Sequence, residues 1–363
     1  MAVSLEEESS LSEYSREVFV LGAGFTKAFL PNAPLMVDDY EGALLAEKFE
    51  KFYYASRVLD WERTRNENGK INIERLLTRL TGRMPYDFDQ KADEELGMLL
   101  VELKKNFIRR IEKAREEKGY TEYLRDFAQY CVSNRIICIT FNYDDAFDEA
   151  IWRVAGMKSP IGRPYWNPDG GYGFFCRPSL WSAVEDTMVQ MDIKTAMLIL
   201  KLHGSINWYP RRGYSEPYSV DAIMHHERWF DPHRYDEVNE QVVFHIEPEP
   251  FLVPPILVKS AIVEQPVLRL LWHIAYNALY RARKVTFVGY SCPLTDIAVR
   301  VLFEESLQLL DQKKDINVVN LARGDSEEKE VVNAYRKVFT KISRRQFDFR
   351  GALEWAKELG SKS

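Results

Sequence analysis

Short apolar runs recur along the chain and are separated by segments whose apolar residues keep helical spacing. The runs are rich in Val and Ile, have the length of buried strands, and lie at Val18–Leu21, Ile136–Thr140, Met197–Leu202, Val285–Val288 and Ile316–Val319. Most are apolar throughout, which is typical of parallel strands covered on both faces. Amphipathic helices are predicted between them at Met98–Ile111, Val299–Leu310 and Val331–Phe339. Alternating strands and helices predict an α/β fold with a doubly wound, Rossmann-like parallel sheet.

The first two runs lie much further apart than a normal crossover connection allows. More than a hundred residues separate Leu21 from Ile136, and this interval is charged, helix-forming and nearly free of Pro and Gly after Pro85. It predicts a large helical insertion at about residues 40–130. Residues 1–15 are acidic and serine-rich without the layout of a signal peptide, so we expect a mobile lead-in before one domain over residues 16–363.

Composition narrows the class of protein. The net charge of −6 argues against a general nucleic-acid or membrane binder, and no apolar run approaches the roughly 20 residues of a membrane span. The four cysteines form no C-x-x-C pair, which favours buried thiols in a reducing cytoplasm over a zinc or redox site. His225, His226 and His233 have no recognised ligand spacing, so we expect solvated loop histidines and no metal.

Small or polar residues follow every predicted strand. In open α/β sheets ligands bind beyond the carboxyl ends of the strands, so these residues should share one edge. Each segment alone is compatible with a turn or a helix cap, but together they predict a site. The segments are Gly22-Ala23-Gly24-Phe25-Thr26, Phe141-Asn142-Tyr143-Asp144, His203-Gly204-Ser205, Gly289-Tyr290-Ser291 and Asn320.

The chemistry of these groups suits a dinucleotide that is attacked at a sugar. Backbone N–H groups from Gly22 to Thr26 can hold a pyrophosphate at a helix start. Lys27 stands where the fingerprint G-x-G-x-x-G would have its third glycine, and either contacts phosphate or covers the helix surface. His203 is a natural general base near neutral pH, and Asn142 can orient a water or a hydroxyl without carrying charge. The set lacks the substrate-side acid and binding cation that hydride transfer would need.

In their order and spacing, the motifs LGAGFT, INIERLL, ITFNYDDAF, LKLHGSINW, FLVPPILVK and FVGYSCPLTD resemble the sirtuin superfamily. They are most similar to sirtuin-like proteins of bacterial anti-phage defence, which hydrolyse NAD+. The resemblance implies that Asn142 and His203 are catalytic and that Asp144 supports Asn142. It also implies that the NAD+ phosphates contact Gly22, Ala23, Gly24 and Thr26. The adenosine side of NAD+ would contact Gly289, Ser291 and Asn320. Asp296 matches the aspartate of a GYS-x-x-x-x-D pattern.

The resemblance also implies an activity and a biological setting. Deacetylating sirtuins carry a zinc module with two C-x-x-C pairs, and their GAG turn continues as G-I-P-D-F-R. This chain has no C-x-x-C pair, and its GAG turn continues with Lys27-Ala28-Phe29 instead. We therefore expect an NAD+ glycohydrolase (an NAD+ nucleosidase) that uses NAD+ as substrate, needs no zinc, and depletes NAD+ in cytoplasmic anti-phage defence by abortive infection. The alternatives are an ADP-ribosyltransferase or deacylase, and a non-catalytic NAD or ADP-ribose sensor. Control is expected from a homo-oligomer or from a HerA-type ATPase or Argonaute-like partner chain.

Overall fold

The computed structural model describes most of the chain as two compact units. The described residues are 11–33, 42–65, 71, 73–81, 89–117, 122–156, 166–174, 176–178, 195–211, 223–225, 250–253, 265–293, 296–307 and 314–360. The first unit comprises Met1–Phe29, Tyr120–Leu252 and Ala261–Ser363. The second comprises Leu30–Gly119 and Val253–Ser260.

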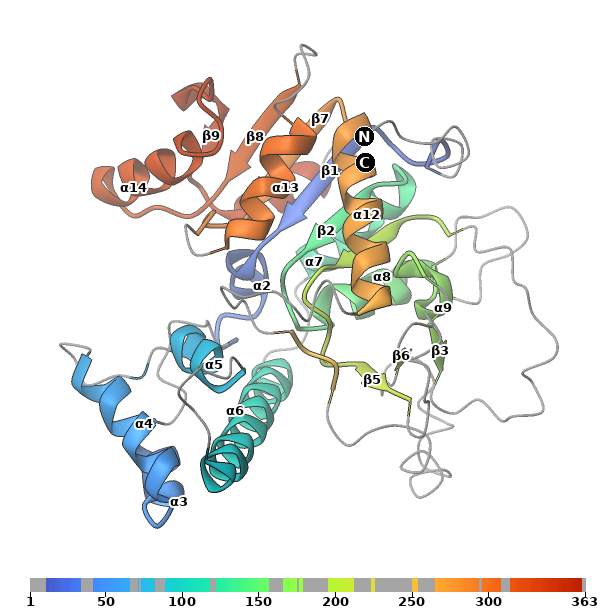
Figure 1. The fold of residues 1–363 in the computed structure, drawn as a ribbon. Coiled ribbons are helices and arrows are strands. Elements are labelled where there is room, and N and C mark those ends of the chain that lie inside the picture. Colours follow the sequence, from blue (N-terminus) through green and yellow to red (C-terminus); the bar gives the residue numbers. More distant parts are fainter. Residues whose placement is uncertain are drawn as a thin grey trace, which may run out of the picture. The chain divides into compact units, whose positions relative to one another are not determined.

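A parallel sheet of six strands forms the centre of the first unit (Figure 1). Its strands are β1 (Glu17–Leu21), β2 (Ile137–Thr140), β4 (Leu198–Lys201), β7 (Lys284–Val288), β8 (Asp315–Val319) and β9 (Phe347–Asp348). They lie in the order β4-β2-β1-β7-β8-β9, and every neighbouring pair is parallel. Counted along the chain, this order is 3-2-1-4-5-6, that of the Rossmann fold. The predicted fold class is therefore confirmed.

Helices cover both faces of this sheet. Phe19 of β1 contacts Phe127 and Trp355 on one face, whereas Phe287 of β7 contacts Phe303 on the other. Phe19 is paired with Thr286, so the alternation of a strand turns Phe287 to the opposite side. The helices of this unit are α2 (Ala23–Phe29), α7 (Glu122–Ser133), α8 (Ala146–Ala155), α9 (Pro168–Gly171), α12 (Pro266–Arg281), α13 (Ile297–Leu307), α14 (Asp325–Arg336) and α15 (Ala352–Gly360). Phe127 lies on α7, Trp355 on α15 and Phe303 on α13.

Several elements differ from the sequence prediction, each for a local reason. The helix predicted from Val331 already begins at Asp325, because its exposed first turns carry no apolar pattern. The two-residue strand β9 is too short to form an apolar run. So are the strands of a small second sheet, which are β3 (Arg177–Pro178), β5 (Trp208–Pro210) and β6 (Ile223–His225).

The N-terminal lead-in is partly placed. Residues 1–10 lie outside the described residues, but Leu11 is buried and the Ser15 N–H donates to Arg135 O at 2.9 Å. Residues 11–15 therefore pack on the first unit. Within the described part of the chain, no helix is both long and apolar enough to cross a membrane.

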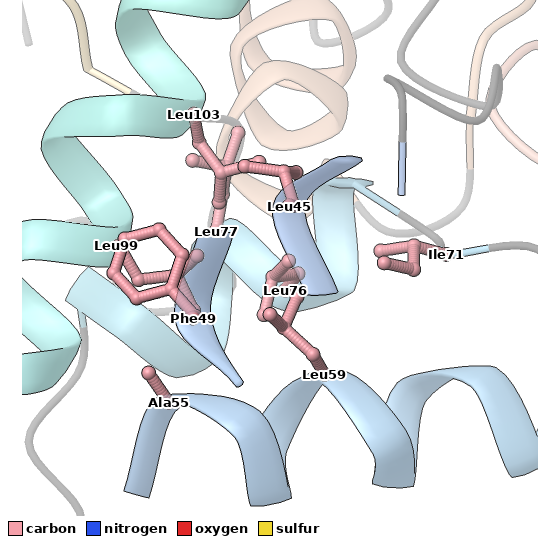
Figure 2. Packing of buried hydrophobic residues seen from close by; sticks show 9 residues of the cluster. All are labelled: Leu45, Phe49, Ala55, Leu59, Ile71, Leu76, Leu77, Leu99 and Leu103. Carbon is pink, nitrogen blue, oxygen red and sulfur yellow. The ribbon is translucent and has the colours of Figure 1, made fainter. Parts of the chain in front are cut away.

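The second unit is built from helices around a core of its own. They are α3 (Gly42–Phe49), α4 (Tyr53–Arg65), α5 (Ile73–Thr81) and α6 (Gln90–Glu117). Figure 2 shows the core, whose buried residues are Leu45, Phe49, Ala55, Leu59, Ile71, Leu76, Leu77, Leu99 and Leu103. All four helices fall within the predicted insertion, whereas α7, at its far end, packs on the sheet of the first unit through Phe127.

Candidate functional site

The order of the sheet places its topological switch point between β1 and β7. From there the chain proceeds outward in opposite directions, to β2 and β4 on one side and to β8 and β9 on the other. Ligands of doubly wound sheets bind in the crevice outside the carboxyl ends of the strands at this point. The two turns that follow β1 and β7 are Gly22-Ala23-Gly24 and Gly289-Tyr290-Ser291, which the sequence singled out.

These two turns are packed backbone to backbone, and this explains their glycines. Gly24 N–H donates to Gly289 O at 2.8 Å, and Gly22 N–H donates to Val288 O at 3.0 Å. A Cβ at Gly289 would lie 2.1 Å from the Phe25 nitrogen, and the φ of 61° at Gly289 also disfavours any other residue. The N–H groups of Gly22, Gly24 and Phe25 all donate within the protein. The phosphate contacts expected of Gly22, Ala23, Gly24 and Thr26 stay a prediction.

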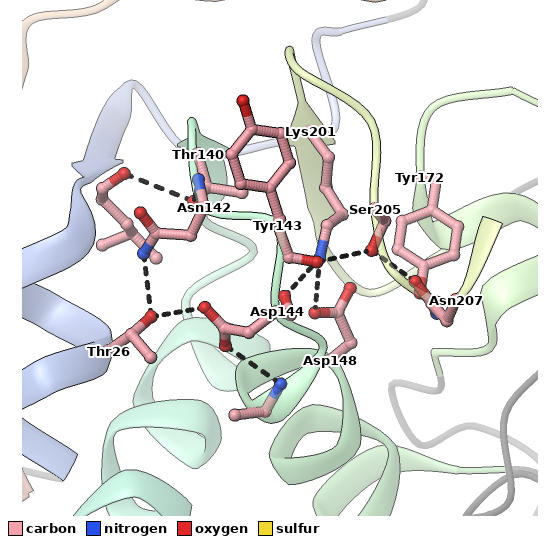
Figure 3. Close-up of polar contacts among 12 residues, drawn as sticks. Thr26, Thr140, Asn142, Tyr143, Asp144, Asp148, Tyr172, Lys201, Ser205 and Asn207 are labelled. Carbon is pink, nitrogen blue, oxygen red and sulfur yellow. Dashed lines mark hydrogen bonds and ion pairs between the residues drawn. The ribbon is translucent and has the colours of Figure 1, made fainter. Parts of the chain in front are cut away.

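The side chain of Asn142 is held in one orientation by residues that follow β1. Its Nδ2 donates to Gly22 O at 2.8 Å and to Thr26 Oγ1 at 2.9 Å, and Figure 3 shows the contact with Thr26. Its backbone N–H donates to Thr140 Oγ1, at the end of β2, at 3.1 Å. Because a carbonyl oxygen only accepts, the NH₂ group must face Gly22. The Thr26 hydroxyl in turn donates to Asp144 Oδ2 at 2.6 Å. The structure thus brings together Gly22, Thr26, Asn142 and Asp144.

A buried ion pair lies beneath this network, and the sequence analysis assigned no role to it. Lys201 Nζ donates to Asp144 O at 2.6 Å and to Asp148 Oδ2 at 3.1 Å. Lys201 and Asp148 are 0% and 1% exposed. Burial raises the pKa of Asp148 to about 6, against the opposing effect of the Lys201 ammonium. The signal for this pair was a lysine that ends an otherwise apolar strand.

His203 lies next to Asp296, a residue more than ninety positions further along the chain. His203 Nε2 is 3.7 Å from Asp296 Oδ2, and both side chains are buried. Asp296 Oδ1 accepts the Val299 N–H at 3.3 Å near the start of α13, which fixes the carboxylate. The His203 ring contacts Phe141 and Tyr143, which flank Asn142 in the sequence. The predicted catalytic pair is therefore gathered around one loop.

The residues predicted to contact the adenosine side of NAD+ lie at the turn after β7 and the end of β8. Asn320 Nδ2 donates to Tyr290 O at 3.3 Å, and the Tyr335 hydroxyl donates to the same oxygen at 2.8 Å. Asn320 Oδ1 accepts the Leu321 N–H at 3.0 Å, so both ends of its amide contact the backbone. Ser291 is exposed. Asn320 thus fixes the turn that carries Gly289 and Ser291, and its contact with the adenosine side of NAD+ stays a prediction.

The expectation of solvated loop histidines is wrong for His225. This residue lies on β6, is 1% exposed, and pairs with Trp208 of β5. A three-residue strand is too short to show an alternating pattern in the sequence. His226 and His233 lie outside the described residues. Among the residues that the structure describes, no three His, Cys, Asp or Glu side chains form a group that could hold a metal ion.

All four cysteines are buried, as predicted, and none of them forms a disulfide. Burial raises the pKa of Cys292 to about 12. This thiol, next to the exposed Ser291, therefore stays protonated at neutral pH.

Comparisons with known proteins find likeness among solved structures. No family model matches the chain, and no curated protein matches it. One similar structure comes from work on the mechanism and regulation of Sir2 enzymes, with 10% identity, a TM-score of 0.41, and 99% of this chain and 97% of that chain covered. Another is a Sir2 homologue in complex with NAD, with 12% identity, a TM-score of 0.42, and 99% and 94% coverage. A third is Sir2Tm bound to a propionylated peptide, with 14% identity, a TM-score of 0.33, and 99% and 98% coverage. Likeness at this level does not assign a function.

Proposed function

We propose that this protein is an NAD+ glycohydrolase, which cleaves the bond between nicotinamide and ribose and releases ADP-ribose. The observation that carries the proposal is the convergence of an oriented amide and a buried histidine at the carboxyl edge of a sheet in Rossmann order. Asn142 lies one residue from Phe141 and Tyr143, whose rings contact His203. The sirtuin-like motifs on which these residues lie support the same reading.

In this proposal NAD+ lies across the switch point between β1 and β7. Its phosphates contact the turn that holds Gly22, Ala23 and Gly24 and the start of α2 at Thr26. Its adenosine contacts the segment of Gly289, Ser291 and Asn320. The nicotinamide ribose is then directed toward Asn142. The close approach of the two glycine turns supports this placement, because the Gly24 N–H donates to Gly289 O at 2.8 Å and one dinucleotide could therefore reach both turns.

The proposed reaction consumes NAD+ and water and yields nicotinamide, ADP-ribose and a proton. The bond between C1′ and the nicotinamide nitrogen breaks, and its electron pair leaves with nicotinamide, which becomes neutral. Asn142, whose NH₂ group is occupied by Gly22 and Thr26, offers its Oδ1 to a water or to a ribose hydroxyl. The water oxygen bonds to C1′ and its proton passes to His203. Asp296, with Oδ2 3.7 Å from His203 Nε2, stabilises the resulting imidazolium.

An assay that measures nicotinamide release from NAD+ by chromatography tests this function. We expect His203→Ala to lower turnover by about 10²–10⁴-fold, the range for loss of a general base. Asn142→Ala should lower it comparably, and thermal melting should show that both variants remain folded. NAD+ cleavage that survives in the double variant would contradict the assignment. ADP-ribose attached to an added acceptor protein would indicate a transferase, and NAD+ binding without cleavage would indicate a sensor.

We extend the proposal to the biological role implied by the motif resemblance. An enzyme that depletes NAD+ is toxic unless controlled, so we propose a defence effector that acts in the cytoplasm and is restrained by self-assembly or by a HerA-type ATPase or Argonaute-like partner. Expression in bacteria should lower cellular NAD+ once the trigger is present. Unchanged NAD+ during phage infection, with the wild-type genomic neighbours co-expressed, would refute this role.

A further inference from the structure

Lys201 is a charged residue in a place that an apolar residue would fill at lower cost. It ends β4, whose four residues are all buried, and its own exposure is 0%. Moving an ammonium group out of water costs several kcal/mol unless hydrogen bonds and a counter-charge offset it. Here the offset comes from the Asp144 carbonyl at 2.6 Å and the Asp148 carboxylate at 3.1 Å. The carbonyl is the shorter contact, which points to a role beyond charge neutralisation.

The loop between β2 and α8 is held by the segment that starts at Lys201. This loop, residues 141–145, carries Asn142 and has neither helix nor strand conformation. Tyr143 O accepts the Ile206 N–H at 2.9 Å and the Ser205 hydroxyl at 3.3 Å. The next carbonyl, that of Asp144, accepts Lys201 Nζ. Because Thr140 of β2 is the register partner of Lys201, these contacts begin where the two strands end.

We propose that Lys201 is a positioning residue, whose ammonium group fixes the Asp144 backbone and, through the hydrogen bond from Thr26 to Asp144, orients the amide of Asn142. The connection is continuous in Figure 3. Lys201 Nζ contacts Asp144 O, Asp144 Oδ2 accepts the Thr26 hydroxyl at 2.6 Å, and Thr26 Oγ1 accepts Asn142 Nδ2 at 2.9 Å. This inference rests on the proposed function, in which the Asn142 amide faces the reacting ribose.

The competing explanation is that Lys201 only neutralises buried carboxylates. Asp148 is its ion-pair partner, and Asp145 lies nearby at 4% exposure. Glu149, also buried, pairs instead with Arg153 at 2.6 Å. If neutralisation were the whole role, removing the lysine and the Asp148 charge together would leave the enzyme intact. The two explanations therefore differ in one double variant.

The test compares Lys201→Met with the double variant Lys201→Met/Asp148→Asn. Methionine keeps the length of the side chain and removes its charge and its hydrogen bonds. We expect the single variant to lower kcat for nicotinamide release by about 10- to 100-fold, as displaced catalytic groups do. The KM for NAD+ should change by less than about 3-fold, since the lost interaction acts on the chemical step. The double variant should regain thermal stability but not kcat, because the Asp144 carbonyl still lacks its donor.

A matched control is Glu62→Gln in the second unit. Glu62 is 0% exposed and pairs with Arg75 at 2.6 Å, so this variant breaks a buried ion pair with no hydrogen bond to Asn142. It should lower the melting temperature and leave kcat unchanged. Recovery of kcat together with stability in the double variant would overturn the positioning role, as would full kcat in Lys201→Met. A wild-type protein that releases no nicotinamide would overturn the proposed function, and with it this inference.

Discussion

The Thr26 hydroxyl is predicted to connect Asp144 with the amide of Asn142, and the variant Thr26→Val tests the contribution of this hydroxyl. Valine keeps the branched shape and removes the donor to Asp144 at 2.6 Å and the acceptor from Asn142 at 2.9 Å. A hydrogen bond to a charged group contributes about 1.5–3 kcal/mol and a neutral one about 1 kcal/mol. Because Asp144 and Thr26 are both buried, water cannot replace the lost donor. We expect the free energy of unfolding to fall by about 2–4 kcal/mol.

The control is Thr26→Ser, which keeps the hydroxyl and loses only a methyl group, at a cost of about 1 kcal/mol. Urea unfolding measures both variants, and nicotinamide release measures their turnover. Valine should lower kcat by about 10-fold or more, equivalent to about 1.4 kcal/mol in the barrier, because the side-chain amide of Asn142 then keeps only its hydrogen bond to Gly22 O. Thr26→Ser should have a kcat close to that of the wild type. Equal losses in the two variants would refute the reasoning, since the hydroxyl would then contribute nothing.

Two further predictions concern the glycine turns and the buried acid. Gly289→Ala should destabilise the protein by more than about 2 kcal/mol, because its Cβ would lie 2.1 Å from the Phe25 nitrogen at a φ of 61°. Gly97→Ala should instead stabilise the protein by up to about 1 kcal/mol, because Gly97 lies in α6 and its new Cβ would meet no described atom outside the local helix backbone within 4 Å. A lower melting temperature for this variant would contradict a helix at Gly97. The pKa of Asp148 rises from 3.8 to about 6 on folding, so the folded protein keeps this proton after the unfolded chain has released it. Its contribution to stability should therefore fall by about 3 kcal/mol between about pH 4 and pH 6 and then level off. In Asp148→Asn, urea unfolding should show that the free energy of unfolding no longer falls across this pH range because of residue 148. An unchanged slope would contradict the raised pKa of Asp148.

The sheet and the edge that carries the candidate site could be predicted from the sequence. Apolar runs such as Val18–Leu21 and Val285–Val288 mark buried parallel strands because both faces of such a strand lose contact with water. Once the strands are known to be parallel, the residues that follow them must share one edge, which places Asn142, His203 and Gly289 together. The short strands and the first turns of α14 could not be predicted, because they carry no periodic apolar pattern.

The partners of each side chain could not be predicted. Nothing local to Thr26 indicates that its hydroxyl donates to Asp144 and accepts from Asn142, both more than a hundred positions away. Nothing local to Lys201 indicates that it reaches the Asp144 carbonyl, 57 positions away.

The sequence by itself determined where the longer buried strands lie and which residues follow them, because burial on both faces gives such a strand a continuous apolar run. Only the tertiary structure decided which of those residues touch. The order of the strands brings His203 to Asp296, the turn of Gly22 to that of Gly289, and β4 to the loop of Asn142. Such contacts join residues far apart in the chain, and no local pattern records them.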